Sequence, residues 1–232
     1  MKYINDLKWY LKKYFKLIPV EGNTQIIERG HRDYVGAKWD VVGKLQIEFL
    51  KSKGLMPNHI LYDIGCGSLR AGTHFINYLD KSKYVGIDKE KLLIDLGIKK
   101  ELGKNIFELK KPHFLVSDNF EFEKINYKFD FAIAQSLFTH LTLNDIKKCL
   151  EKLRSKSKPN SIMYATFDEI NYTKITNKRK KLTNPPFSHS NISFFYHREE
   201  IREVAEKSGF DFNYIGDWGH PAMQMMFELN PV

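Results

Sequence analysis

The stretch Ile60-Leu61-Tyr62-Asp63-Ile64-Gly65-Cys66-Gly67-Ser68-Leu69-Arg70-Ala71-Gly72 decides the fold of this chain. Its first five residues are mostly apolar and predict a buried strand. Gly65 and Gly67 follow, where the backbone has to turn sharply and where a ligand could approach closely. A helix is expected over about residues 69–79. The order of strand, glycine turn and helix is typical of nucleotide sites in doubly wound α/β folds.

The spacing of the glycines separates two kinds of nucleotide site. A dinucleotide fingerprint, G-x-G-x-x-G, would need its third glycine at position 70, which is Arg70, and Gly72 comes two residues late. Asp63 precedes the first glycine by two positions, where a carboxylate would repel a pyrophosphate but could accept hydrogen bonds from an ammonium group. An NAD-binding oxidoreductase is therefore disfavoured. A plain strand-to-helix turn without a ligand is the other interpretation.

The D-x-G-x-G pattern of this stretch resembles motif I of class I S-adenosylmethionine-dependent methyltransferases. The cofactor of that family carries a methionine amine, a carboxylate and a sulfonium, and it has no phosphate. The resemblance implies that S-adenosylmethionine is the cofactor and S-adenosylhomocysteine the product. It also implies that the cofactor is contacted by Asp63, Gly65, Cys66 and Gly67.

The composition is that of an ordinary globular domain of 232 residues, with 42% hydrophobic and 28% charged residues. The formal net charge of +9 favours anionic partners such as phosphorylated metabolites, nucleic acid or an acidic membrane face, although solvated lysines explain it equally well. Cys66 and Cys149 lack metal-ligand spacing, so no metal site is predicted, and two scattered cysteines suit a reducing cytoplasm. The chain has no run of 18 apolar residues, so we expect a cytoplasmic protein without a transmembrane segment.

Residues 1–39 are expected to precede the domain itself. Residues 2–18 predict an amphipathic helix, because apolar side chains recur there at three- and four-residue spacing. This helix could pack on the domain, which we favour, cover the site, or lie on a membrane surface. In class I methyltransferases the segment before motif I often closes over the cofactor. Arg32 and Tyr34, in the loop at residues 29–36, are candidates for that role, and an ordinary surface connection is the alternative.

The domain itself, residues 40–232, alternates helices with strands. Asp40 is expected to cap a helix that Gly54 and Pro57 end. Further helices are predicted at about residues 91–102, 143–154 and 197–208, further strands at 84–88, 113–117, 129–134, 161–167, 212–215 and 224–229, and a turn at Pro159–Asn160. This order matches the seven-stranded, Rossmann-like doubly wound sheet of class I methyltransferases, whose last strand inserts antiparallel.

A polar insertion at residues 168–193 interrupts this alternation. It holds the basic run 178–181, which is either a phosphate contact or a solvated loop, and the tetrapeptide Asn184-Pro185-Pro186-Phe187. N-P-P-F at the end of strand four would resemble the catalytic motif of enzymes that methylate amino groups of adenine or glutamine. Here it follows a basic loop and not the fourth strand, so we interpret it as a Pro-Pro turn.

Further cofactor candidates follow the second and third strands, because ligands of such sheets bind at the carboxyl ends of the strands. Asp88 ends the second strand and is expected to receive both ribose hydroxyls, with Lys89 beside it. A helix cap is its alternative role. The resemblance implies that Asp118 meets the adenine amino group and that Asn119 or Phe120 flanks the ring. A simple turn acid is the alternative for Asp118.

The resemblance implies that the segment after the fourth strand faces both the cofactor and the methyl acceptor. Gln135 and Ser136 would touch the methionine part of the cofactor. His140 is the best-placed general base, and a structural histidine at the start of the next helix is the alternative. His220 lies in the loop between the last two strands and is the second catalytic candidate. A tight hairpin with a packed tryptophan is the alternative for that loop.

Residues 63–72, 135–141 and 217–221 also resemble a group of small bacterial methyltransferases, some of them associated with capsule and other surface-polysaccharide synthesis. We therefore expect methyl transfer to an oxygen of a small, phosphorylated or nucleotide-linked acceptor, such as a sugar precursor of a surface glycan. A sugar hydroxyl would need a base such as His140 or His220, whereas a phosphate-type oxygen would need none.

Two other functions stay open. The net charge allows an RNA methyltransferase, although no separate RNA-binding module is visible. A cofactor-binding module without activity is the other alternative, but a protein that had lost its activity would not need to keep Asp63, Gly65, Gly67 and Asp88. The oligomeric state is not predicted.

Overall fold

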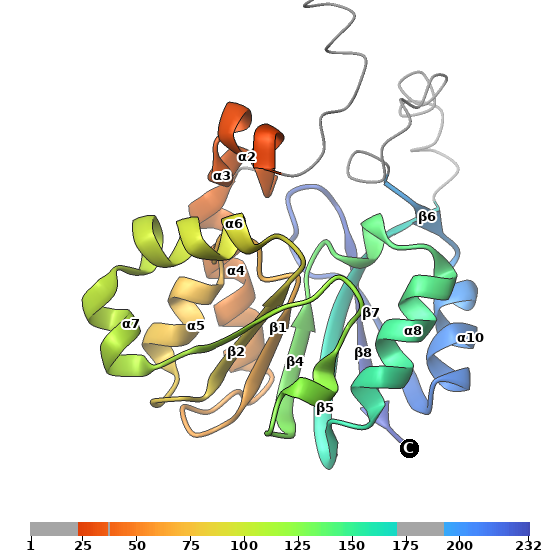
Figure 1. Ribbon diagram of the computed structural model, residues 1–232. Helices are drawn as coiled ribbons and strands as arrows, with labels where there is room; N and C mark the ends of the chain where they lie inside the picture. Colours follow the sequence, from red (N-terminus) through yellow and green to blue (C-terminus); the bar gives the residue numbers. More distant parts are fainter. Residues whose placement is uncertain (1–22, 37, 171–192) are drawn as a thin grey trace, which may run out of the picture.

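The computed structural model describes residues 23–36, 38–170 and 193–232. Its main sheet has the strand order β3-β2-β1-β4-β5-β8-β7 (Figure 1). The strands are β1 (Leu61–Ile64), β2 (Tyr84–Asp88), β3 (His113–Val116), β4 (Phe129–Ala134), β5 (Ser157–Glu169), β7 (Phe210–Asp217) and β8 (Met225–Pro231). Strands β1 to β5 run parallel, and β8 lies antiparallel between β5 and β7. This is the class I methyltransferase fold, so the fold expected from the sequence is confirmed.

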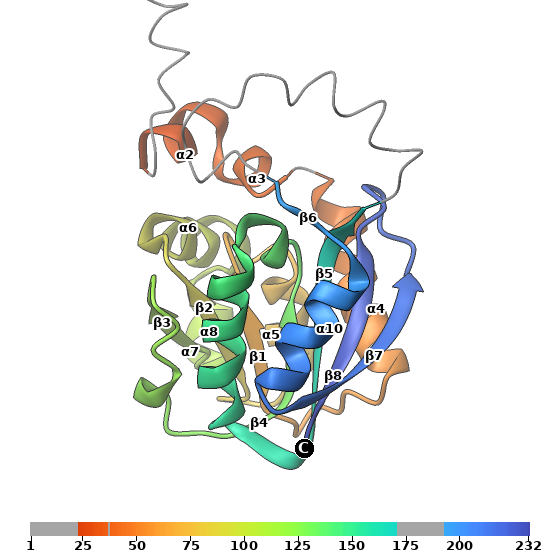
Figure 2. The ribbon, with the colours of Figure 1, turned by 90° about the vertical axis from the view of Figure 1, so that its right-hand side faces the viewer.

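Helices cover both faces of the sheet (Figures 1 and 2). The helices on one face are α8 (Leu143–Arg154) and α10 (Arg198–Lys207), and those on the other are α4 (Trp39–Ser52), α5 (Gly72–Tyr78), α6 (Lys91–Leu96) and α7 (Lys104–Lys110). Two short helices, α2 (Asn23–Arg29) and α3 (His31–Tyr34), lie on the side of the sheet where the parallel strands end (Figure 1). We call residues 23–36, which contain them, the covering segment.

The parallel register brings the predicted site residues to one edge. Asp63 of β1 is level with Gly86 of β2 and with Ile133 of β4. The turns that follow these three strands therefore start at the same height and meet beyond the carboxyl ends of the sheet. The glycine turn, Asp88 and Gln135 come together in this way.

Some predicted boundaries are wrong for physical reasons. Residues 159–160 lie inside β5 and do not form a turn. Phe129 pairs with Ser157 and Phe131 with Ile162, so β5 forms a bulge that the Ser161 hydroxyl closes by bonding to both backbone groups of Lys158. Proline is tolerated at such a bulge.

Helix starts also differ from the prediction. Lys38 is the N-cap of α4, so Asp40 lies in the first helical turn, where a negative charge is still favourable. Helix α5 begins at Gly72, later than expected. The predicted helix at 91–102 continues from α6 as a π-helix, Gly97–Leu102, and the sequence did not predict α7 or the two-residue strand β6 (Phe195–Tyr196), which pairs with the end of β5.

Gly97 lets the π-helix pack directly on the glycine turn. A Cβ atom at Gly97 would lie 2.6 Å from the carbonyl oxygen of Ser68 and 2.8 Å from Leu69 Cγ. We expect Gly97→Ala to lower the free energy of unfolding by about 2 kcal/mol, because the turn must move to make room. The melting temperature should fall by about 5 °C. Lys99→Ala, at an exposed position of the same segment, is the control and should change little; equal melting of both variants would contradict the prediction.

Several sequence predictions lie outside the described residues. They are the amphipathic helix at 2–18, the basic run at 178–181 and the tetrapeptide at 184–187. Within the described residues, no helix is both long enough and apolar enough to span a bilayer.

Candidate functional site

A cavity of about 690 Å³ lies at the carboxyl edge of the sheet, beneath the covering segment. This is within the usual size range of small-molecule sites. All the residues predicted to bind the cofactor line it except Asn119, and His140 lines it as well. The backbone carbonyl of Asn119 accepts a hydrogen bond from Lys152 Nζ. His220 lies behind the wall and does not line the cavity.

The glycines of the turn allow two other segments to approach it closely. Gly65 has a φ of +78° and Gly67 a φ of +53°, both in the region that favours glycine. A Cβ atom at Gly67 would lie 2.9 Å from Val35 of the covering segment. A Cβ atom at Gly65 would lie 3.3 Å from the side chain of Leu137, which follows β4. Because Gly65 and Gly67 have no side chains, Leu137 and Val35 can pack directly against the turn and form part of the cavity wall.

Asp88 is held against the glycine turn by backbone amides. Its Oδ2 accepts a hydrogen bond from the Gly67 amide at 2.8 Å, and its Oδ1 accepts one from the Glu90 amide at 2.9 Å. Burial raises the pKa of Asp88, and the two amide bonds oppose this rise. Each carboxylate oxygen can accept more than one hydrogen bond, so Asp88 keeps the capacity to bind hydroxyl groups in the cavity.

Asp63 is a buried acid at the end of β1. Tyr84 donates a hydrogen bond from its hydroxyl to Asp63 Oδ2 at 2.7 Å. Gly72 makes room for this contact, because a Cβ atom there would lie 2.6 Å from the Tyr84 hydroxyl. Burial raises the pKa of Asp63 to about 7. Gly72 therefore leaves space for the Tyr84 hydroxyl that binds Asp63, and it does not have the pyrophosphate-binding role of the third glycine in a dinucleotide site.

Arg70 is the main functional candidate that the sequence reasoning missed, since it counted this residue only as an absent glycine. The side chain is buried and lines the cavity. Its Nη1 donates to the Val35 carbonyl at 2.9 Å, and its Nη2 donates to Gln135 Oε1 at 2.7 Å. Burial lowers the pKa of Arg70 to about 10, so the guanidinium stays charged at neutral pH.

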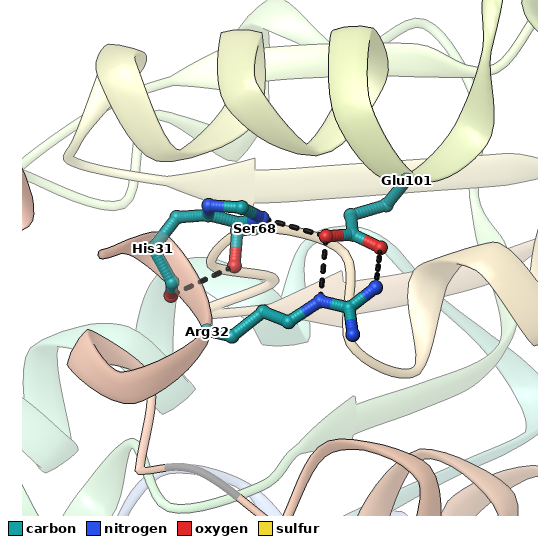
Figure 3. A network of polar contacts seen from close by, with 4 residues as sticks. All are labelled: His31, Arg32, Ser68 and Glu101. Atoms are coloured by element: carbon teal, nitrogen blue, oxygen red, sulfur yellow. Dashed lines mark hydrogen bonds and ion pairs between the residues drawn. The ribbon is translucent and has the colours of Figure 1, made fainter.

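A carboxylate of the π-helix fixes the covering segment in place (Figure 3). Glu101 accepts two hydrogen bonds from Arg32, at 2.8 and 2.5 Å, and its Oε1 lies 2.6 Å from His31 Nε2. Ser68, in the glycine turn, donates a hydrogen bond to the His31 carbonyl at 3.2 Å. Of the two predicted covering residues, Tyr34 lines the cavity, whereas Arg32 holds the segment from outside it.

Both ring nitrogens of His220 face nitrogen donors. Nε2 lies 3.1 Å from the side-chain nitrogen of Gln135, and Nδ1 lies 3.3 Å from the backbone nitrogen of Ala222. Burial, together with the positive charges of Arg70 and Lys38, lowers the pKa of His220 to about 4. A protonated ring would present two donors to two donors, so this position is poorly suited to a general base.

The low pKa of His220 predicts a pH effect on stability. The unfolded chain binds this proton near pH 6.5 and the folded protein only near pH 4, so unfolding becomes easier as the pH falls through this window. Asp63 acts in the opposite direction, because its pKa is raised by folding. We therefore expect the stability difference between the wild type and His220→Asn to shrink from pH 6.5 to pH 4. Urea unfolding at several pH values measures it, and a constant difference would contradict the prediction.

A metal site is not seen in the part of the chain that the structure describes. No three His, Cys, Asp or Glu side chains gather there in a way that could hold an ion.

Comparison with known proteins finds a family model that matches the part of the chain from β1 to β5. Residues 62–163, from β1 into β5, match the sequence model of a family described as "Methyltransferase domain". The protein is an S-adenosylmethionine-dependent methyltransferase. A search of curated proteins finds no match to this methyltransferase.

Solved structures share the fold of the methyltransferase at low identity. Magnesium protoporphyrin IX methyltransferase from Synechocystis PCC 6803, with bound SAH, is 16% identical over 97% of this chain and 100% of its own, with a TM-score of 0.66. A methyltransferase from Clostridium acetobutylicum ATCC 824 is 12% identical over 90% and 97%, with a TM-score of 0.63. Human N-acetylserotonin methyltransferase is 13% identical over 96% and 62%, with a TM-score of 0.61. These likenesses concern the fold alone.

Proposed function

We propose that this methyltransferase acts on an oxygen of a small-molecule acceptor, such as a nucleotide-linked sugar or another precursor of a capsule or surface glycan. The cavity carries this proposal, because its volume of about 690 Å³ suits a cofactor together with the reacting part of a small molecule. Two of the similar structures are named for small acceptors, magnesium protoporphyrin IX and N-acetylserotonin. The link to surface glycans rests on the sequence resemblance.

The residues that line the cavity fit S-adenosylmethionine part by part. Asp88 would accept the ribose hydroxyls, and Asp118 with Phe120 would hold the adenine. At the other end Asp63 and Arg70 offer a negative and a positive charge, which match the ammonium and the carboxylate of the methionine part. The raised pKa of Asp63 would fall when an ammonium group binds beside it.

When bound, the cofactor supplies a methyl group on a sulfonium, which an acceptor oxygen can attack in line. The chain contributes chiefly by holding the acceptor in position and by excluding water. His140 would take the proton of an acceptor hydroxyl, since it lines the cavity three residues after Leu137. His220 would support the wall, because its Nδ1 accepts a hydrogen bond from the Ala222 amide and its Nε2 lies against the Gln135 side chain.

The distribution of charge also favours a small acceptor over RNA. Residues 1–22 and 171–192 contain ten of the 37 basic residues and two of the 28 acidic residues, so eight of the nine net positive charges belong to them. The described domain is nearly neutral. RNA methylation would depend on the two basic segments.

The proposal is tested with methyl-labelled S-adenosylmethionine and a cell extract divided into small-molecule, RNA and protein fractions. Label is expected in the small-molecule fraction and should disappear with Asp88→Ala. Label in RNA alone would contradict the proposed acceptor class. Once the acceptor is isolated, His140→Ala should lower the rate if a hydroxyl is methylated, whereas a phosphate-type oxygen should react at nearly the wild-type rate.

A further inference from the structure

Ser136 has a backbone conformation that residues with a side chain rarely adopt. Its φ is +59°, and it lies two residues after the end of β4, in the wall of the cavity. For a residue with a Cβ atom this left-handed conformation is strained and persists only where neighbouring groups impose it.

Three hydrogen bonds hold Ser136 in this conformation. Its amide donates to Thr166 Oγ1 at 2.8 Å, its hydroxyl donates to Gln224 Oε1 at 2.8 Å, and its carbonyl accepts from Thr139 Oγ1 at 2.8 Å. Thr166 belongs to β5 and Gln224 immediately precedes β8, so the strained residue is tied to β5, which pairs with β4, and to the start of β8, which pairs with β5.

Gln224 Oε1 is the centre of these contacts. It also accepts from the Thr166 hydroxyl at 3.0 Å and from the Gln135 amide nitrogen at 3.2 Å. The orientation of Gln135 is determined independently, because Arg70 has only donors and therefore faces the Gln135 oxygen. Thr166, Gln224 and Gln135 are buried and Ser136 is half-buried, so these hydrogen bonds would be costly to lose.

The conformation of Ser136 sets the direction in which the chain leaves β4. The next residue, Leu137, lies over Gly65 of the glycine turn, in the space that a Cβ atom of Gly65 would need. Gln135, which comes just before Ser136, faces Arg70. A change at Ser136 would therefore move the two parts of the wall that border the methionine end of the proposed cofactor site.

We propose that Gln224 and Thr166, which do not line the cavity, are positioning residues for cofactor binding. They impose the left-handed turn at Ser136 and thereby place Leu137 against Gly65 and Gln135 against Arg70. This inference rests on the proposed cofactor site, since it concerns the wall of that site.

The test measures the dissociation constant of S-adenosylhomocysteine by calorimetry, together with the melting temperature, for the full chain. Thr166→Val and Gln224→Leu are expected to bind about tenfold more weakly than the wild type, because each removes an acceptor of a Ser136 donor. Ser136→Ala and Ser136→Gly both lose the hydroxyl, but only glycine adopts this conformation freely. Ser136→Ala should therefore bind at least about tenfold more weakly than the wild type, and Ser136→Gly should bind about threefold or more tighter than Ser136→Ala.

Ser161→Ala is the control for Thr166→Val, since both residues are buried and hydrogen-bonded in β5, but Ser161 lies near the amino end of the strand. It should lower the melting temperature without changing the affinity. Wild-type affinity in folded Thr166→Val, or equal affinities in Ser136→Ala and Ser136→Gly, would overturn the inference. If Gln224→Leu fails to fold, these two comparisons decide alone. Failure of the wild type to bind would overturn the proposed cofactor site and this inference with it.

Discussion

The Asp88→Ala variant is expected to bind S-adenosylhomocysteine at least about 100-fold more weakly than the wild type. The carboxylate accepts hydrogen bonds from the amides of Gly67 and Glu90, and it would accept two more from the ribose. Hydrogen bonds to a charged group contribute roughly 1.5–3 kcal/mol each, so losing both ribose bonds accounts for a hundredfold change or more. The variant also leaves the Gly67 amide without its acceptor, which loosens the glycine turn beside the ligand.

Asp95→Ala is the control for this prediction. Asp95 is an exposed acid of α6, one turn beyond Lys91, with which it forms an ion pair. Its removal changes the net charge as Asp88→Ala does but leaves the cavity intact, so the affinity should stay within about twofold, as expected for an exposed ion pair. Calorimetric titration of both variants, with melting curves to show that they are folded, makes the comparison. Equal binding by Asp88→Ala and the wild type would exclude a ribose role for Asp88.

The sequence predicted those elements whose pattern is local. Strands β2 and β4 and helix α8 have the predicted boundaries, because continuous apolar runs and helical spacing identify them without a partner. The start of β5 was missed because the pairing of Phe129 with Ser157 imposes it across the sheet, against the turn preference of Pro159 and Asn160. The short strand β6 likewise exists through its pairing with the end of β5.

The same difference separates the predicted residues that line the cavity from the residues that the sequence did not point to. Residues at the carboxyl ends of parallel strands could be placed together, since the fold itself brings those ends to one edge. Arg70, Thr166 and Gln224 were not predicted, because their roles depend on partners distant in the sequence. Arg70 meets Gln135 across 65 positions, and Gln224 meets Ser136 across 88. A threonine in an apolar strand and a glutamine beside a hairpin carry no local sign of such contacts.

Arg70→Met is expected to weaken S-adenosylhomocysteine binding about 50-fold and to leave the binding of its decarboxylated analogue within about threefold of the wild type. A charge-assisted bond between the guanidinium and the methionine carboxylate accounts for a loss of this size. Methionine keeps much of the side-chain length and apolar volume but removes the charge. Arg70→Lys should bind S-adenosylhomocysteine more weakly than the wild type but more tightly than Arg70→Met, because an ammonium keeps the charge but not the paired donors of the guanidinium.

The comparison of two ligands separates a direct contact from an indirect one. Arg70 also donates a hydrogen bond to Val35, so its loss could loosen the covering segment and weaken every ligand alike. Arg32→Met provides the reference for that effect, because Arg32 holds the same segment through Glu101 but does not line the cavity. It should weaken both ligands by the same factor. If Arg70→Met also weakened both equally, Arg70 would be a support of the covering segment, and the carboxylate of the cofactor would need another partner.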